Sequence, residues 1–160
     1  MVSLWVVNAS PIILLGKVSR IDLLRTLGVD VVIPDKAVIE IERGGTDDPG
    51  VRALASADWL RIVADPIPVA LSNLNLGAGE TAVLAHALAN PGSGVILDDR
   101  AARNAAAGLG LPCLGTLGLI LFAKTSGRLS AARPILESLR NQGMFLSDAV
   151  LNRALLQVGE

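Results

Sequence analysis

The chain has 160 residues and a formal net charge of −1, so it is long enough to bury a core, and we expect a single domain over residues 1–160. One cysteine and one histidine exclude an intrachain disulfide and argue against a zinc cluster. No apolar run approaches the length of a membrane span, and no signal peptide is visible, so the sequence predicts a cytoplasmic protein without a membrane partner.

Charge is distributed unevenly along the chain. Residues 1–99 hold 7 basic and 12 acidic side chains, whereas residues 100–160 hold 7 basic and 3 acidic ones. This asymmetry could place an acidic pocket beside a basic rim, or it could belong to a fully solvated surface. The chain has only two Trp, two Phe and no Tyr, which argues against a platform of aromatic side chains for stacking nucleic-acid bases.

The first part of the chain alternates between short apolar runs and helical patterns. Ser10 followed by Pro11 indicates an N-cap and the start of a helix, which places Asn8 at the junction between this helix and the strand before it. Glu40 lies beside the apolar face of a later helix. We expect strands at residues 4–7, 31–33 and 59–63, the last at a sheet edge, and helices at 10–15, 19–27, from 34 onward, and 51–57.

The second part continues the same alternation. Glu80 lies in the first turn of the clearest amphipathic helix, where an acid also interacts favourably with the helix dipole. We expect that helix at 76–89, a buried strand at 94–97, a helix at 99–107, an extended segment at 112–114, and helices from 115, at 130–142 and at 147–158. Four or five short strands alternating with helices predict an α/β fold with a mainly parallel sheet flanked by helices.

Two carboxylates, Asp98 and Asp99, directly follow the apolar run of the central strand. In open α/β sheets the carboxyl ends of the strands form the edge where ligands bind, so these residues suit a metal or phosphate site. The alternative is that Asp99 only caps the helix that follows. His86 lies six positions after Glu80 and is therefore rotated away from that carboxylate, so we do not expect it in a site.

Polar or acidic residues thus mark four junctions, at Asn8, Glu40, Glu80 and the pair Asp98–Asp99. Mg²⁺ and Mn²⁺ prefer such oxygen ligands, and a cation would relieve the mutual repulsion of clustered carboxylates. A bound metal ion could also lower the pKa of a water molecule and assist displacement at a phosphodiester. The residues therefore predict a magnesium or manganese site at the sheet edge.

Three ordered motifs carry a family resemblance: Leu76-Gly77-Ala78-Gly79-Glu80, Asp98-Asp99-Arg100-Ala101-Ala102-Arg103 and Gly115-Thr116-Leu117-Gly118. With them the chain resembles a PIN domain, in the bacterial and archaeal branch that carries this glycine-Glu helix start, Asp-Asp-x-x-Ala-Arg turn and Gly-Thr-x-Gly, and the resemblance covers nearly the whole chain. It implies a Rossmann-like PIN fold and a Mg²⁺- or Mn²⁺-dependent ribonuclease acting on RNA, often the toxin of a toxin–antitoxin pair. An antitoxin protein would then be a partner. A homodimer is also plausible, because the chain is rich in apolar helices.

The resemblance also implies the site. By position, Asn8, Glu40, Glu80 and Asp99 match the four catalytic acids of the family. Asp98 is an additional carboxylate next to Asp99. Glu40, Glu80, Asp98 and Asp99 would hold the metal ion.

Substrate contacts are expected from Arg100 and Arg103 through phosphate, and from Ser10 and Thr116. Each has an ordinary alternative, because the arginines could lie on a solvated helix face and the hydroxyl residues could be caps or turn residues.

Asn8 departs from the family pattern, which has Asp there. An amide oxygen can bind a metal ion, but it carries no charge and cannot act as a base. Two hypotheses follow. The chain is a working metal-dependent endoribonuclease, or it is a catalytically impaired PIN-fold module that binds nucleic acid or protein.

Overall fold

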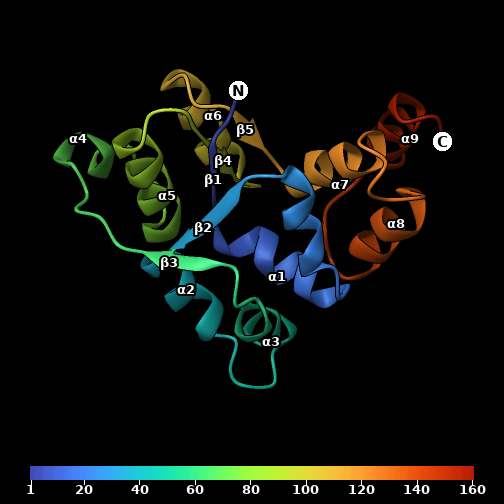
Figure 1. Cartoon of the computed structure of the whole chain (residues 1–160), viewed down its shortest axis with the longest axis horizontal. Coiled ribbons are helices and arrows are strands. Elements are labelled where there is room, and N and C mark those ends of the chain that lie inside the picture. The colour runs from blue at the N-terminus through green and yellow to red at the C-terminus, as the bar shows by residue number, and fades with distance from the viewer.

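The structure, a computed structural model, describes all 160 residues, and five parallel strands lie at its centre. They are β1 (Leu4–Val7), β2 (Asp30–Pro34), β3 (Arg61–Val63), β4 (Ser93–Ile96) and β5 (Cys113–Leu114). Their order across the sheet is β3-β2-β1-β4-β5, and every pair is parallel (Figure 1). The predicted α/β class and parallel sheet are confirmed.

Helices connect and flank the strands, as the alternating pattern predicts. None combines the length and the apolar content needed to cross a membrane. They are α1 (Ala9–Lys17), the 3₁₀-helix η1 (Ile21–Leu27), α2 (Asp35–Glu42), α3 (Pro49–Ser56), α4 (Val69–Ser72), α5 (Ala78–Ala89), α6 (Arg100–Gly108), α7 (Thr116–Thr125), α8 (Arg133–Asn141) and α9 (Asp148–Gln157).

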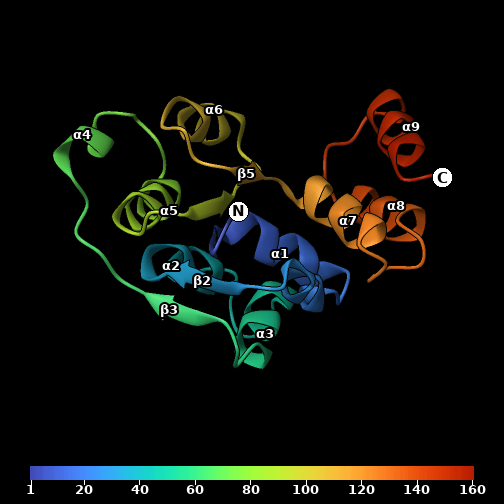
Figure 2. The same cartoon turned by 45° about the horizontal axis from the view of Figure 1, so that its top comes forward.

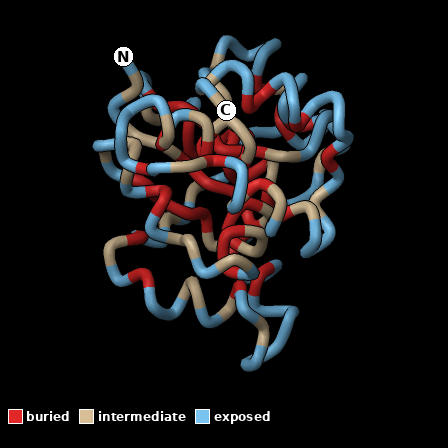
Figure 3. The backbone as a smooth tube through the Cα atoms, turned by 90° about the vertical axis from the view of Figure 1, so that its right-hand side faces the viewer, coloured by how far each residue is buried: buried red, intermediate tan, exposed pale blue.

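The inner strands β2, β1 and β4 bury side chains on both faces, because successive side chains point to opposite sides of the sheet, whereas the edge strand β3 is largely exposed. One set of strand residues joins a core with α1, η1, α2, α7, α8 and α9, and the alternate set joins a second core with α4, α5 and α6. Val7 and Ile96 belong to the first core, and Val6 and Val95 to the second. Figure 3 shows the buried segments gathered inside a surface of exposed turns.

β1 occupies the middle of the sheet, and the chain moves from one side of it to the other between β3 and β4. Ligands of open α/β sheets bind at such a reversal of strand order, outside the carboxyl ends of the strands. Asn8 follows the end of β1, and its backbone N–H donates to the carbonyl of Ile96 over 3.1 Å, which joins the ends of the two neighbouring strands.

Three helices, α7, α8 and α9, gather at one end of the molecule (Figures 1 and 2). The carboxylate of Glu160 accepts hydrogen bonds from the backbone N–H groups of Ala132, over 2.6 Å, and Arg133, over 3.2 Å. The Ala132 bond is the main reason that the pKa of the Glu160 carboxyl is lowered. This contact ties the last residue of the chain to the start of α8.

Several helices begin one to three residues away from the expected start. α1 begins at Ala9 with Asn8 as N-cap, so Ser10 lies inside the first turn; the missing N–H of Pro11 is tolerated there because first-turn N–H groups have no intrahelical partner. The helix expected from Ser19 is the 3₁₀-helix η1, which begins two residues later. The helix expected at 130–142 is α8, which begins at Arg133 with Ala132 as its N-cap.

Candidate metal and RNA site

Asn8 is almost completely buried at the end of β1, with 3% of its surface exposed, and its side-chain oxygen has no hydrogen-bond partner. It is the only buried side-chain polar atom of the chain in that condition. Leaving a buried acceptor unpaired costs about 1–3 kcal/mol. An orphaned oxygen of this kind at a ligand-binding sheet edge needs an explanation, and a cation is the simplest partner for it.

Glu40 and Asn8 border the same small space. A Cβ added at Gly79 would lie 2.7 Å from Asn8 Oδ1 and 2.9 Å from Glu40 Oε2. The space exists only because residue 79 has no side chain, and α2 and α5 pack closely at this point. Two oxygens that cannot donate hydrogen bonds therefore face one cradle, which suits a hard divalent cation.

Glu80 lies next to this cradle at the start of α5. A hollow of about 380 Å³ there is bordered by both Glu40 and Glu80, together with the cations Lys36 and Arg43. The carboxylate of Glu80 folds back toward Gly77, in close contact with the place where a Cβ of that residue would stand. Figure 2 shows α2 and α5 lying side by side.

Asp98 lies beyond the end of β4 and is held by three donors. Its Oδ1 accepts the backbone N–H of Thr116 over 2.7 Å, and its Oδ2 accepts the hydroxyls of Thr116 over 2.7 Å and Ser10 over 3.3 Å. Thr116 is fully buried. The two hydroxyl residues predicted to contact substrate thus hold the Asp98 carboxylate in one orientation.

Asp99 has a different role in the structure. Its Oδ2 accepts the backbone N–H of Ala102 over 2.9 Å, so Asp99 is the N-cap of α6. This is the capping role that was the alternative to a metal or phosphate site. Successive residues at a strand end point in different directions, and here Asp98 turns toward Ser10 and Thr116 while Asp99 turns to the helix.

The two arginines of α6 also differ. Arg100 is exposed and makes no side-chain hydrogen bond or ion pair. Arg103 reaches back over the strand end, where its Nη1 donates to the carbonyl of Leu97 over 3.1 Å. A Cβ at Gly115 would collide with this guanidinium, so the glycine leaves the room in which Arg103 lies. Arg103 therefore borders Asp98 from the α6 side.

The predicted four-acid cluster is not assembled as a whole. No group of three Asp, Glu, His or Cys side chains lies close enough to hold a metal ion. The structure brings Asn8 and Glu40 together beside Gly79, and Glu40 and Glu80 border the same α2–α5 hollow. It also brings Asp98, Ser10, Thr116 and Arg103 together at the ends of β4 and β5. Asp99 belongs to neither group.

One polar pair was missed by sequence analysis. Buried His86 contacts the Asp65 carboxylate through Nδ1, and the Asn90 side chain lies 3.4 Å from Nε2. Asp65 is 21 positions away in the connection after β3, so spacing along a helix could not reveal it. The pair ties that connection to α5.

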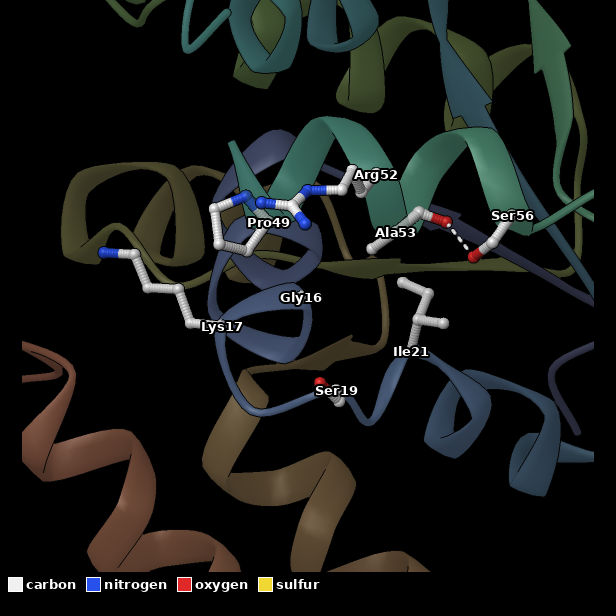
Figure 4. A pocket seen from close by; sticks show the side chains of 8 residues that line it. All are labelled: Gly16, Lys17, Ser19, Ile21, Pro49, Arg52, Ala53 and Ser56. Carbon is white, nitrogen blue, oxygen red and sulfur yellow. Dashed lines mark hydrogen bonds between the residues drawn. The ribbon is translucent and has the colours of Figure 1, made fainter. Parts of the chain in front are cut away.

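Two features away from this sheet edge, the thiol of Cys113 and a hollow between α1 and α3, offer no group of metal ligands. Burial raises the pKa of the Cys113 thiol, which keeps it protonated and inert near neutral pH. A second hollow, of about 420 Å³, lies between the end of α1 and α3, and its lining in Figure 4 includes Lys17 and Arg52 but no carboxylate.

A sequence model described as a PIN domain matches residues 4–160 of the chain, and so nearly its full length. Among curated proteins, none matches the chain at a significant level.

Proposed function

Because the chain belongs to the PIN domain family, whose members are typically nucleases, we propose that it is a divalent-metal-dependent endoribonuclease that hydrolyses phosphodiester bonds of RNA. The observation that carries this proposal is the unpartnered oxygen of Asn8 beside the carboxylate of Glu40. The buried amide oxygen, the nearby carboxylate and the glycine cradle between them fit Mg²⁺ or Mn²⁺, which bind oxygen ligands and retain water.

In this proposal Asn8, Glu40 and Glu80 hold the metal ion. When bound, the ion would lower the pKa of a water molecule and stabilise negative charge on the phosphate. Asn8 contributes an oxygen without charge, so the cluster carries one negative charge fewer than four acids would supply.

Asp98, and not Asp99, is the acid that we assign to the other side of the site. Its two oxygens offer about four acceptor positions, of which three are used, so one remains to take a proton from a water molecule. Thr116 and Ser10 orient that carboxylate. Arg103, fixed by the Leu97 carbonyl, and exposed Arg100 would bind the phosphate through charge-assisted hydrogen bonds.

The test is cleavage of a panel of structured and single-stranded RNAs with Mg²⁺, Mn²⁺ or EDTA. We expect wild-type cleavage that EDTA abolishes, at least a hundredfold loss in Glu40→Gln and Asp98→Asn, and a much smaller loss in Asp99→Asn. Asp99→Asn is the matched control, since it removes the same charge one residue away and keeps a capping oxygen. Equal losses in the Asp98 and Asp99 variants would overturn the assignment.

A second candidate function is favoured by one observation, the lack of three acids close enough to hold a metal ion, with Asn8 at a position where the family has Asp. The chain would then bind RNA or protein without cutting. In that case the wild type does not cleave RNA in any metal, and Asn8→Asp introduces metal-dependent cleavage.

The same proposal includes two protein partners, an antitoxin and a second copy of this chain. If the chain is the toxin of a toxin–antitoxin pair, its expression should arrest growth, and co-expression of a small protein encoded beside it should relieve the arrest. Light scattering of the purified chain, alone and with that protein, tests both the homodimer and the antitoxin complex.

A further inference from the structure

Two cations, Lys36 in the first turn of α2 and Arg43 at its C-cap, flank Glu40 but do not pair with it. Lys36 lies four positions before Glu40 and Arg43 lies three positions after it, which are the spacings at which ion pairs form on a helix. Neither cation forms an ion pair or a side-chain hydrogen bond, although both border the α2–α5 hollow together with Glu40 and Glu80. Both are exposed, and so free to bind an anion.

Lys36 and Arg43 do not pair with Glu40 because of the direction in which its carboxylate points. Its Oε2 lies beside the Gly79 cradle and the Asn8 oxygen, so it is turned toward the sheet edge and away from its helical neighbours. Helix stability does not account for Lys36, because a cation in the first turn of a helix interacts unfavourably with the helix dipole. The cations therefore form a basic rim on an acidic hollow.

This rim lies at the opposite end of the sheet edge from Arg103. Lys36 lies in α2, the helix that follows β2, and Arg43 is the C-cap of that helix, whereas Arg103 borders the ends of β4 and β5. Adjacent strands are about 4.8 Å apart, so β2 and β5 are about 14 Å apart across the edge. Asn8 follows β1 and Asp98 follows β4, which are the two strands between β2 and β5.

We propose that Lys36 and Arg43 bind the phosphate backbone of a single-stranded RNA on the α2 side of the site. The strand then crosses the carboxyl edge of the sheet from β2 to β5, with the phosphate to be cut over the acids and the next phosphates on the cations at either end. This inference rests on the proposed RNA substrate, but it concerns binding and is independent of whether the chain cleaves.

The test measures the salt dependence of binding. A fluorescein-labelled single-stranded RNA is titrated with protein in EDTA, between 50 and 200 mM salt, and followed by fluorescence anisotropy. Each phosphate contact on a single strand contributes about 0.7 to the slope of log affinity against log salt. Lys36→Gln/Arg43→Gln should lower the magnitude of that slope by about 1.4 and weaken binding at 50 mM salt by about tenfold or more.

Arg128→Gln is the matched control. Arg128 is exposed and unpaired, but it follows the far end of α7, away from the sheet edge. Its variant should keep the wild-type slope, and thermal unfolding should show that all variants are folded. An unchanged slope in the Lys36/Arg43 variant, an equal change in the control, or no binding of RNA by the wild type overturns the inference.

The outcomes separate this inference from the proposed reaction. Binding that depends on Lys36 and Arg43 without any cleavage retains the RNA path and refutes the nuclease. Cleavage with an unchanged salt slope retains the nuclease and refutes the path.

Discussion

The Gly79 cradle gives the sharpest prediction. In Gly79→Ala the new methyl group would stand 2.7 Å from Asn8 Oδ1 and 2.9 Å from Glu40 Oε2, closer than carbon and oxygen atoms approach without strain. Asn8 is buried and cannot move easily, whereas Glu40 ends in an exposed, flexible side chain. We therefore expect Glu40 to turn away from the cradle and toward Lys36.

Two opposing terms set the effect on stability. Replacing glycine by alanine within a helix stabilises by about 1 kcal/mol, and forcing an extra carbon into a packed site costs about 1–3 kcal/mol. The free energy of unfolding should therefore fall by no more than about 2 kcal/mol, and the protein stays folded. Loss of one oxygen ligand should weaken binding of Mn²⁺ by at least about tenfold.

The assays are urea denaturation for stability and calorimetric titration with Mn²⁺ for binding. Gly108→Ala is the control, because a Cβ there meets nothing within 4 Å and should only stabilise, by up to about 1 kcal/mol. Wild-type affinity for Mn²⁺ in folded Gly79→Ala would falsify the assignment of the cradle as the metal site.

Three further predictions follow from contacts away from the cradle. Gly115→Ala should displace the Arg103 guanidinium, change the free energy of unfolding by less than about 1 kcal/mol, and weaken RNA binding in the anisotropy assay; tight binding by this variant would contradict a phosphate role for Arg103. His86→Leu and Asp65→Asn should each cost about 1–3 kcal/mol, with strong coupling in a double-mutant cycle; additive losses would show that the contact contributes little. Glu160 has a lowered pKa, so its carboxylate stabilises the fold above its unfolded pKa, near 4.5, and this contribution is lost as the pH falls through the folded value. The difference in unfolding temperature between wild type and Glu160→Gln should therefore be present at pH 7 and shrink below pH 4, and a difference that persists at acidic pH would refute this origin.

Local patterns were sufficient to predict the sheet. The apolar runs at β1, β2 and β4 are short, rich in Val and Ile, and each is followed directly by a helical pattern, so each connection had to cross back over the sheet. The 3₁₀-helix η1 was expected as an ordinary helix, because the pattern of residues does not distinguish the two and tertiary contacts decide between them.

The site was harder to predict, because its geometry depends on contacts between distant segments. Asp98 and Asp99 are chemically identical neighbours, and which one faces Ser10 depends on the pairing of Val7 with Ile96 and on the position of Thr116. Asn8 and Glu40 were expected near one sheet edge, but nothing in the local sequence indicates that Gly79 supplies the space beside their side-chain oxygens.

The wide separation of these groups along the chain has a consequence for folding. Asn8, Glu40, Gly79 and Asp98 follow or begin different crossovers of the sheet, so no short fragment contains the site and no part of it forms before the strands are in register. Closing such long loops is slow and entropically costly. A ligand that binds only the folded sheet edge then raises the free energy of unfolding of the whole domain. At a ligand concentration of a hundred times its dissociation constant, the increase is about 2.7 kcal/mol. Under the proposed function, the supply of metal ion or RNA would therefore also change how much of this chain survives proteolysis.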